Sequence, residues 1–187
     1  MRIIAGEWKG RRIAAPKGMA VRPTPERVRE AWMSILQNDL SGARVLDLFA
    51  GTGALGLEAL SRGAEHVDFV EHDARSLRAL QQNVATLGAK ARCTVHRADA
   101  LQFSSLLTSR VASASSLRTV DSVLRTPYGV CFADPPYRQG VAVALASLWL
   151  AAPFSTIFGV EHDARETLPD GGDRRRYGDT AITIYRT

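Results

Sequence analysis

The chain has 187 residues, of which 45% are hydrophobic and 23% are charged, and its formal net charge is +5. This length suits one domain with a full core, and the apolar runs are too short for a membrane-spanning helix, which needs ~20 apolar residues, or for a signal peptide. The sequence therefore argues against a membrane protein and predicts a single cytoplasmic domain over residues 1–187, with Cys93 and Cys131 as buried free thiols.

The first 30 residues carry the whole excess of positive charge. They hold eight Lys or Arg and three acidic residues, whereas basic and acidic residues balance in the remainder. Residues 2–6 and 11–15 are predicted to be two strands of a hairpin, with a turn at residues 7–10. A basic hairpin on a neutral body indicates a segment that binds a polyanion such as nucleic acid. A solvated hairpin that only aids solubility is the alternative explanation.

The next predicted element is a helix over residues 26–37, where apolar side chains recur at helical spacing. Thr24 suits the N-cap of this helix, and Pro25 suits its first position. We expect residues 1–40 to form the basic hairpin and this helix, and residues 41–187 to form the catalytic core.

Strands and helices alternate through the rest of the chain. We expect strands at residues 44–49, 66–71, 92–96, 130–133, 156–161 and 181–185, and helices at residues 54–62, 74–87 and 141–150. This alternation predicts an α/β fold, with a mostly parallel sheet covered by helices on both faces. Residues 104–126 are Ser-rich and fit either a helix with a solvated face or an insertion without regular structure.

A Gly-rich turn follows the first of these strands. Residues 51–56 have the pattern G-x-G-x-x-G, and Glu71 lies 20 residues after its first glycine, which is typical of dinucleotide-binding folds. Asp47 argues against a dinucleotide, because its carboxylate would lie near the pyrophosphate and repel it. The same carboxylate would attract the ammonium and sulfonium groups of S-adenosylmethionine, so the sequence favours that cofactor.

Three acidic residues, Asp47, Glu71 and Asp99, stand at three successive strand ends, where α/β folds bind ligands. We expect Glu71 to accept hydrogen bonds from the ribose and Asp99 from the adenine amine. Capping of the following helices would explain Asp47 or Asp99 alone but explains the set of three poorly. The predicted cofactor-binding residues are Asp47, Phe49, Ala50, Gly51, Thr52, Gly53, Glu71, His72, Asp99 and Ala100.

Asp134, Pro135, Pro136 and Tyr137 follow the apolar strand at residues 130–133. The two prolines fix φ and remove two donors, so the chain leaves the sheet stiffly. A carboxylate and an aromatic ring held at the sheet edge can grip a nucleobase, with the ring on its face and the acid on its exocyclic amine. We predict that these four residues are catalytic. The alternative is a turn that caps the strand, with the tyrosine in the core.

With these motifs, the chain resembles the class I S-adenosylmethionine-dependent methyltransferases. More narrowly, it is similar to the RsmD family, bacterial methyltransferases for guanine N2 in small-subunit (16S) ribosomal RNA. The resemblance spans almost the whole chain, through residues 2–6, 10–12, 22–24, 27–30, 46–64, 70–71, 134–137 and 177–180.

The resemblance implies a Rossmann-like sheet of seven strands, mostly parallel, with the last strand antiparallel. It also implies methyl transfer from S-adenosylmethionine to a guanine N2 amine. The residues expected to contact RNA are Arg11, Arg12, Arg22, Thr24, Arg27 and Arg29. We expect the ribosomal RNA to be presented within a small-subunit particle, because a short basic arm on a neutral body suits weak affinity for free RNA. We expect a monomer without a metal.

Other functions fit the sequence less well. A DNA adenine-N6 or cytosine-N4 amino-methyltransferase uses a similar motif and cofactor, but usually needs an added recognition domain, for which the chain has no room. A protein-glutamine methyltransferase would more typically have Asn in place of Asp134. Asp47 disfavours a NAD-dependent oxidoreductase, and a non-catalytic RNA-binding module would not need three acids at one crevice.

Overall fold

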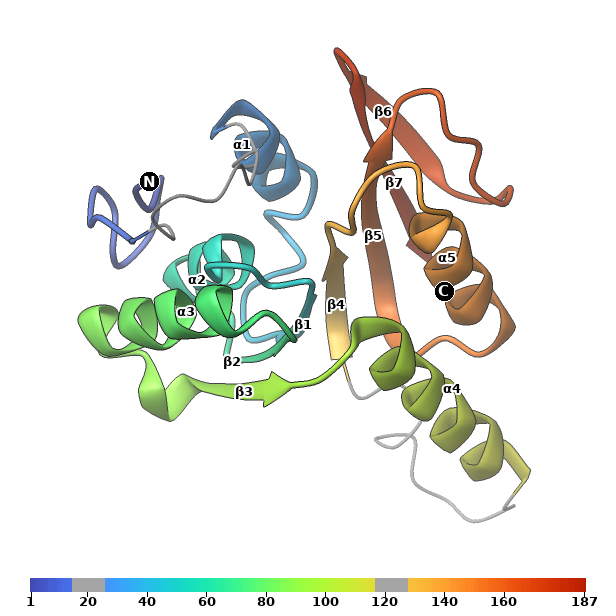
Figure 1. The fold of residues 1–187 in the computed structure, drawn as a ribbon, viewed down its shortest axis with the longest axis horizontal. Coiled ribbons are helices and arrows are strands. Elements are labelled where there is room, and N and C mark those ends of the chain that lie inside the picture. The colour runs from blue at the N-terminus through green and yellow to red at the C-terminus, as the bar shows by residue number, and fades with distance from the viewer. Residues whose placement is uncertain (15–25, 117–127) are drawn as a thin grey trace.

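A computed structural model describes residues 1–14, 26–116 and 128–187 of the chain (Figure 1). The helices are α1 (Glu26–Ile35), α2 (Ala54–Ser61), α3 (Ala74–Leu87), α4 (Ala100–Ser116) and α5 (Val141–Ala151), with a short 3₁₀ helix η1 (Lys90–Arg92). The strands are β1 (Arg44–Leu48), β2 (His66–Glu71), β3 (Cys93–Arg97), β4 (Tyr128–Ala133), β5 (Ser155–Asp163), β6 (Asp173–Tyr177) and β7 (Thr180–Arg186).

The seven strands form one sheet in the order β3-β2-β1-β4-β5-β7-β6. Strands β1 to β5 pair in parallel, and β7 runs antiparallel to both of its neighbours, β5 and β6. The chain leaves β3 at one edge and returns through α4 to β4 in the centre, so the strand order switches between β1 and β4. Open α/β sheets bind ligands at the carboxyl end of such a switch. The prediction of a mostly parallel seven-stranded sheet with an antiparallel last strand is confirmed.

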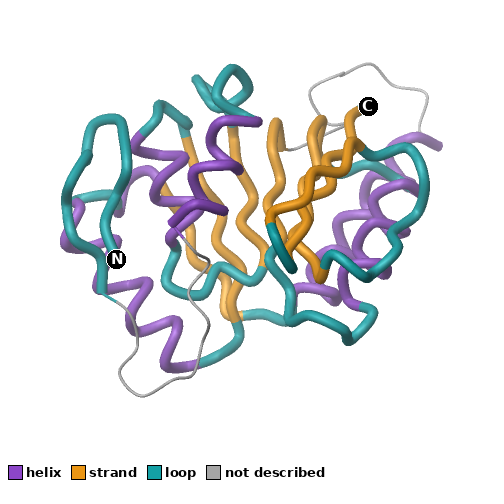
Figure 2. The backbone as a smooth tube through the Cα atoms, turned by 90° about the horizontal axis from the view of Figure 1, so that it is seen from above, coloured by secondary structure: helices purple, strands orange, loops and turns teal. Residues whose placement is uncertain are grey.

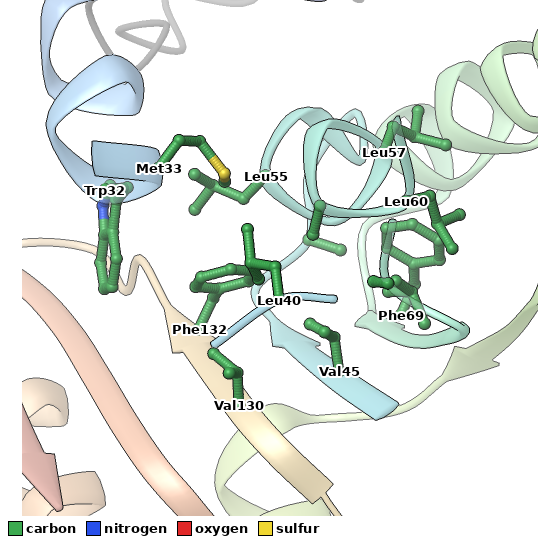
Figure 3. Close-up of a cluster of buried hydrophobic side chains, with 14 of the residues drawn as sticks. Trp32, Met33, Leu40, Val45, Leu55, Leu57, Leu60, Phe69, Val130 and Phe132 are labelled. Carbon is green, nitrogen blue, oxygen red and sulfur yellow. The ribbon is translucent and has the colours of Figure 1, made fainter. Parts of the chain in front are cut away.

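Helices cover both faces of the sheet, as predicted (Figure 2). Helices α1, α2 and α3 pack on one face and α4 and α5 on the other, so the buried side chains form two clusters. Alternate residues of one strand feed the two clusters: Val130 and Phe132 face α1 to α3, whereas Cys131 faces α4 and α5. The ring of Trp32 meets that of Phe132 edge-on, with centroids 5.4 Å apart (Figure 3).

The elements differ from the sequence-based expectations mainly at their ends. Helix α1 stops at Ile35, and β1 stops at Leu48 because Phe49 has a φ of 60°, which a strand does not allow. The Ser-rich stretch begins as helix α4, and residues 117–127 lie outside the described residues. Thr24 and Pro25, the predicted start of α1, also lie outside them.

Two predictions were incomplete. Strand β6 was missed, because Asp173 and the three arginines after it are exposed and show no apolar alternation. Cys131 is buried, but Cys93 is only half-buried, because β3 is an edge strand.

The N-terminal segment pairs with itself through one antiparallel bridge, Arg2 to Arg12, rather than through two full strands. The amides of Ile4 and Ala5 donate instead to the buried carboxylate of Glu58 on α2, at 2.7 and 3.0 Å. These donors are therefore used to attach the segment to the body of the protein. We call residues 1–14 the arm.

Within the described ranges, no helix is long and apolar enough to cross a membrane.

Gly56 on α2 allows this helix to pack closely on β2. A Cβ at this position would overlap the ring edge of Phe69 and come within 2.8 Å of Val67 Cγ1. We expect Gly56→Ala to lower the free energy of unfolding by roughly 1–3 kcal/mol, because the added methyl group has no space. Urea denaturation measures this. Gln82→Ala, at an exposed position of α3, is the matched control and should change stability by less than about 0.5 kcal/mol. An unchanged unfolding midpoint for Gly56→Ala would contradict this packing.

Candidate active site

Three carboxylates meet at the carboxyl edge of the sheet, beside the β1–β4 switch. In the parallel register, Leu48 of β1 pairs with Val70 of β2 and with Ala133 of β4. Glu71 and Asp134 directly follow these two partners, so they stand at the strand ends on either side of β1, which carries Asp47. Burial, with a smaller contribution from the charges of Asp134 and Glu71, raises the pKa of Asp47 to about 7. The structure therefore brings three predicted site residues together in one region of concentrated negative charge, which we call the carboxylate cluster.

Asp47 is 2% exposed and also binds the first turn of α2, because its Oδ2 accepts a hydrogen bond from the amide of Gly56 at 2.9 Å. This contact is the capping role that we considered as an alternative. The hydrogen bond lowers the pKa of Asp47, but burial has the larger effect. Asp47 thus combines a cap with a place in the carboxylate cluster.

Glu71 shapes the Gly-rich turn. Its Oε2 accepts from the amide of Gly51 at 2.8 Å, and its Oε1 accepts from the amides of His72 and Asp73 at 2.8 and 2.7 Å. The turn has left-handed φ angles of 57° at Gly51 and 80° at Gly53, a conformation that glycine adopts without strain. A single buried carboxylate therefore fixes both the turn after β1 and the start of α3.

The remaining predicted cofactor residues surround this turn. Phe49 has a left-handed φ of 60°, and the amide of Ala50 donates to the carbonyl of Val70 at 3.0 Å. His72 is exposed, with its Nδ1 3.6 Å from Glu71 Oε1. The strained φ of Phe49 marks the point where the chain leaves β1 for the turn.

Asp99 is exposed at the end of the β3–α4 connection and caps α4, since its Oδ1 accepts from the amide of Gln102 at 2.9 Å. Asp99 therefore has the helix-capping role that was the alternative to cofactor binding. Ala100, the first residue of α4, is buried in the cluster that faces α5. Asp99 contributes to the same sheet edge as Glu71, because β3 pairs in parallel with β2 up to Arg97.

Tyr137 is fixed by its hydroxyl group. The hydroxyl donates to Glu161 Oε1 at 2.6 Å and lies 3.0 Å from Thr180 Oγ1. Trp32 Nε1 donates to the other oxygen of Glu161 at 3.1 Å. Burial and the charge of Glu161 raise the pKa of Tyr137 well above its usual value, so the side chain stays a neutral phenol. The ring is half-buried, so Tyr137 is neither fully in the core nor fully free at the sheet edge, the two alternatives predicted from the sequence.

The residues around Tyr137 form the rest of the predicted catalytic segment. Asp134 is half-buried, Pro135 is buried and Pro136 is exposed. Arg138 follows with a φ of 60°, and its Nε donates to Asp163 Oδ2 at 2.7 Å, which holds the end of the segment against β5.

Glu161 was missed by the sequence analysis, although it carries two of the hydrogen bonds that define the site. It is 2% exposed and ends an otherwise apolar run in β5. A carboxylate in such a run is costly unless it is paired, so this position held a usable signal. Trp32 fitted the apolar face of a helix and gave no separate signal.

The predicted RNA-contacting residues divide into three groups. Arg12 and Arg27 are exposed, and Arg11 is exposed with its Nη2 donating to the carbonyl of Thr86 on α3. Arg22 and Thr24 lie outside the described residues.

Arg29 is a correction, because it is 1% exposed and cannot reach a phosphate. Its Nη2 donates to the carbonyl of Arg2 at 2.8 Å, while its Nε and Nη1 have no partner in the described part of the chain. Burial lowers its pKa, although the charge of Glu58 acts in the opposite direction. The helical position that we expected to face RNA instead faces the arm.

Across residues 1–14, 26–116 and 128–187, no three His, Cys, Asp or Glu side chains are grouped so that they could hold a metal ion.

Comparisons with known proteins show the family of this chain. The family model described as Conserved hypothetical protein 95 matches residues 1–186. Ribosomal RNA small subunit methyltransferase D of Escherichia coli strain K12 is 35% identical over 174 residues, which cover 90% of this chain and 78% of that protein. A solved structure of a hypothetical protein from Thermus thermophilus is 30% identical. The match covers 100% of this chain and 99% of that protein's chain, with a TM-score of 0.80.

A more distant structure shares the fold alone. It is the T. thermophilus 16S rRNA N2 G1207 methyltransferase RsmC in complex with AdoMet and guanosine, which is 20% identical. The match covers 91% of this chain and 44% of that chain, with a TM-score of 0.60.

The buried charge of Asp47 predicts a pH-dependent stability difference. Its pKa is about 7 in the folded protein, against 3.8 for an ordinary aspartate, so the folded state favours the protonated form. The stability that comes from keeping Asp47 protonated is complete at low pH, below its ordinary pKa of 3.8, and is lost as the pH rises through the folded pKa of about 7. Asp47→Asn stays neutral and keeps an acceptor for Gly56. We expect it to melt at a higher temperature than the wild type at pH 8, by roughly 2–4 °C for each kcal/mol gained, with the difference shrinking towards acidic pH.

Thermal melts of both proteins from acidic to alkaline pH measure this difference. Asp179→Asn is the matched control, because it removes the same charge from an exposed position. Equal melting curves for Asp47→Asn and wild type at alkaline pH would refute the conclusion that the ionised Asp47 side chain destabilises the folded protein.

Proposed function

Since this chain belongs to the RsmD family, described as Conserved hypothetical protein 95, we propose that it transfers a methyl group from S-adenosylmethionine to the exocyclic N2 amine of a guanine in small-subunit ribosomal RNA. The name of the E. coli relative supports ribosomal RNA of the small subunit as the substrate and methylation as the reaction. The finer assignment, to guanine N2, is supported by the segment 134–137 and its surroundings.

The carboxylate cluster is the observation that carries the proposal. Burial is the main cause of the raised pKa of Asp47, and the charges of Asp134 and Glu71 add to it, so a cationic ligand would offset this concentration of negative charge. S-adenosylmethionine fits this environment because its methionine end carries an ammonium and a sulfonium. When bound, it supplies an electrophilic methyl group. Asp47 would hold the cationic end, and Glu71 would hold the ribose.

The arrangement of Tyr137 supports binding of a flat base. Its hydroxyl is tied to Glu161 and Thr180, so the ring is the part of this side chain available for recognition. Aromatic side chains stack on bases that are flipped out of a helix or presented in a loop. Tyr137 would thus hold the guanine, with the exocyclic amine directed to Asp134.

The chemistry proposed for Asp134 follows from the weakness of the nucleophile. The N2 lone pair of guanine is delocalised into the ring, so the amine must be positioned and polarised. Asp134 and the carbonyl of Pro135 would accept hydrogen bonds from the two N2 protons. This draws electron density onto nitrogen and stabilises the positive charge that develops there. The rigid prolines keep these acceptors in place, and proton loss can follow methyl transfer.

The proposed substrate contacts come from the first part of the chain. Arg11, Arg12 and Arg27 would contact phosphates, which position an RNA without reading its sequence. We propose that residues 1–40 bind the RNA and that residues 41–187 bind the cofactor and carry out the reaction. The substrate would be a small-subunit particle, and the protein would act as a monomer.

Methyl transfer tests the whole proposal. Ribosomal RNA and small subunits from cells that lack this protein are incubated with it and with radiolabelled S-adenosylmethionine, and the labelled nucleosides are identified. We expect a single product, N2-methylguanosine. Labelling of DNA instead of RNA would favour a DNA amino-methyltransferase, and labelling of another position of the base would overturn the assignment of the N2 amine.

Asp134→Ala separates catalysis from cofactor binding. We expect kcat to fall on the order of 100-fold or more, because the developing charge on nitrogen loses its acceptor, while the Kd for S-adenosylmethionine changes by no more than a few-fold. Turnover is measured with the substrate identified above, and the Kd by calorimetry. Asp179→Asn, at an exposed position, should behave as the wild type in both assays. Near-normal turnover by Asp134→Ala would remove this residue from the mechanism.

The salt dependence of RNA binding tests whether the arm contacts phosphates. Arg12→Gln should weaken RNA binding and lower the slope of log K against log salt by about one, because one phosphate contact is lost. Arg186→Gln is a control of equal charge, since Arg186 lies at the end of β7 and pairs with Asp39. Filter binding at several salt concentrations measures both. An unchanged slope for Arg12→Gln would exclude Arg12 as a phosphate contact.

A further inference from the structure

A buried amide on α3 joins the arm to the Gly-rich turn. Asn83 is 1% exposed. Its Oδ1 accepts from the amide of Ala14 at 2.7 Å, and its Nδ2 donates to the carbonyl of Ala14 at 3.0 Å and to the carbonyl of Thr52 at 2.9 Å. All three partners are backbone groups. One side chain therefore holds both polar groups of an arm residue and one carbonyl of the turn.

Several other attachments of the arm lie on α2. Glu58 accepts from the amides of Ile4 and Ala5, and Ser61 Oγ accepts from the amide of Trp8 at 2.9 Å. These contacts hold the beginning of the arm. Asn83 acts further along, at Ala14, two residues after the proposed phosphate contact Arg12.

The turn that contains the Thr52 carbonyl has further hydrogen bonds at its two glycine amides. Glu71 holds the amide of Gly51, and the carbonyl of Ala50 accepts from the amide of Gly53 at 2.7 Å. Asn83 adds a constraint from α3 on the peptide between these glycines. The orientation of the Thr52–Gly53 peptide therefore depends on where the amide of Asn83 lies.

The amide group of Asn83 is planar and rigid, so its two Nδ2 protons cannot move independently. A shift of Ala14 that turns this plane also changes the hydrogen bond to Thr52. A buried amide that loses a partner has no water to replace it. The docked arm and the ordered turn thus support each other through one side chain.

We propose that Asn83 is a positioning residue that couples the RNA-binding arm to the cofactor-binding turn. Cofactor binding orders the turn, which holds Asn83 and Ala14 in place and strengthens RNA binding by the arm. Thermodynamic linkage requires the reverse effect to be equal, so RNA tightens cofactor binding by the same factor. This inference rests on the proposed function, because it assumes that the turn binds S-adenosylmethionine and that the arm binds RNA.

Hydrogen exchange at the Ala14 amide tests the coupling without catalysis. S-adenosylhomocysteine should slow exchange of this amide in the wild type, although the arm and the turn are separate segments of the chain. Asn83→Leu has a similar volume and no hydrogen bonds, and should abolish the effect. Asn83→Asp keeps the acceptor for the Ala14 amide and loses the donor to the carbonyls of both Ala14 and Thr52. The Ala14 amide should therefore stay hydrogen-bonded, with weaker basal protection than in the wild type, but should not respond to the ligand, which a merely structural role does not predict.

Equilibrium binding gives the second readout. The Kd for S-adenosylhomocysteine is measured with and without unmethylated small-subunit particles. We expect RNA to tighten it on the order of 10-fold in the wild type, and by less than 2-fold, roughly no coupling, in Asn83→Leu and Asn83→Asp. Gln82→Ala, the exposed neighbour on α3, should keep the wild-type factor. Circular dichroism shows that each variant is folded.

The outcomes separate the two proposals. If the wild type binds no S-adenosylhomocysteine, the proposed function fails and the coupling falls with it. If the wild type binds the ligand but the Ala14 amide does not respond, or if Asn83→Asp keeps the full coupling factor, only the role of Asn83 is overturned.

Discussion

Burial of Asp47 beside two other carboxylates is the constraint on which the site depends. The charge lies at the end of β1, where the strand order switches, and its pKa of about 7 reflects a place that disfavours ionisation. The fold compensates only in part, through the amide of Gly56. Such an arrangement lowers stability and is retained where a function uses it. A cationic cofactor is the partner that this surplus of negative charge would favour.

Glu161 is another buried carboxylate that shapes the site, and it lies on β5, beyond β4 from Asp47. It joins α1 to the proposed catalytic segment, because Trp32 and Tyr137 donate to its two oxygens. The edge-on contact of Trp32 with Phe132 extends this link to β4, the strand that precedes Asp134 (Figure 3). The position of the aromatic ring in the site is therefore set by the packing of α1 on the sheet. A helix that looked like part of the core in the sequence thus also supports the proposed active site.

The arm is integrated into the domain more closely than its charge suggested. Glu58 and Asn83 take up its backbone groups, and Arg29, once expected to face RNA, is buried against it. An RNA bound by the exposed arginines of the arm would therefore act on a segment that is hydrogen-bonded to α2 and is linked to the Gly-rich turn through Asn83. The proposed coupling of substrate and cofactor binding would pass through these hydrogen bonds.

The sequence by itself determined the order and type of most elements, a mostly parallel sheet and the placing of acids at its carboxyl edge. These features depend on local periodicity, on glycines and prolines, and on the rule that parallel strands end at one edge. Only the tertiary structure decided the burial of Arg29, the polar edge strand β6, the capping by Asp99 and the anchoring of Tyr137 by Glu161. The reason is that such contacts join residues far apart in the chain, such as Trp32 and Glu161, and a buried polar group selects its partner only when the packed elements bring that partner within hydrogen-bonding distance.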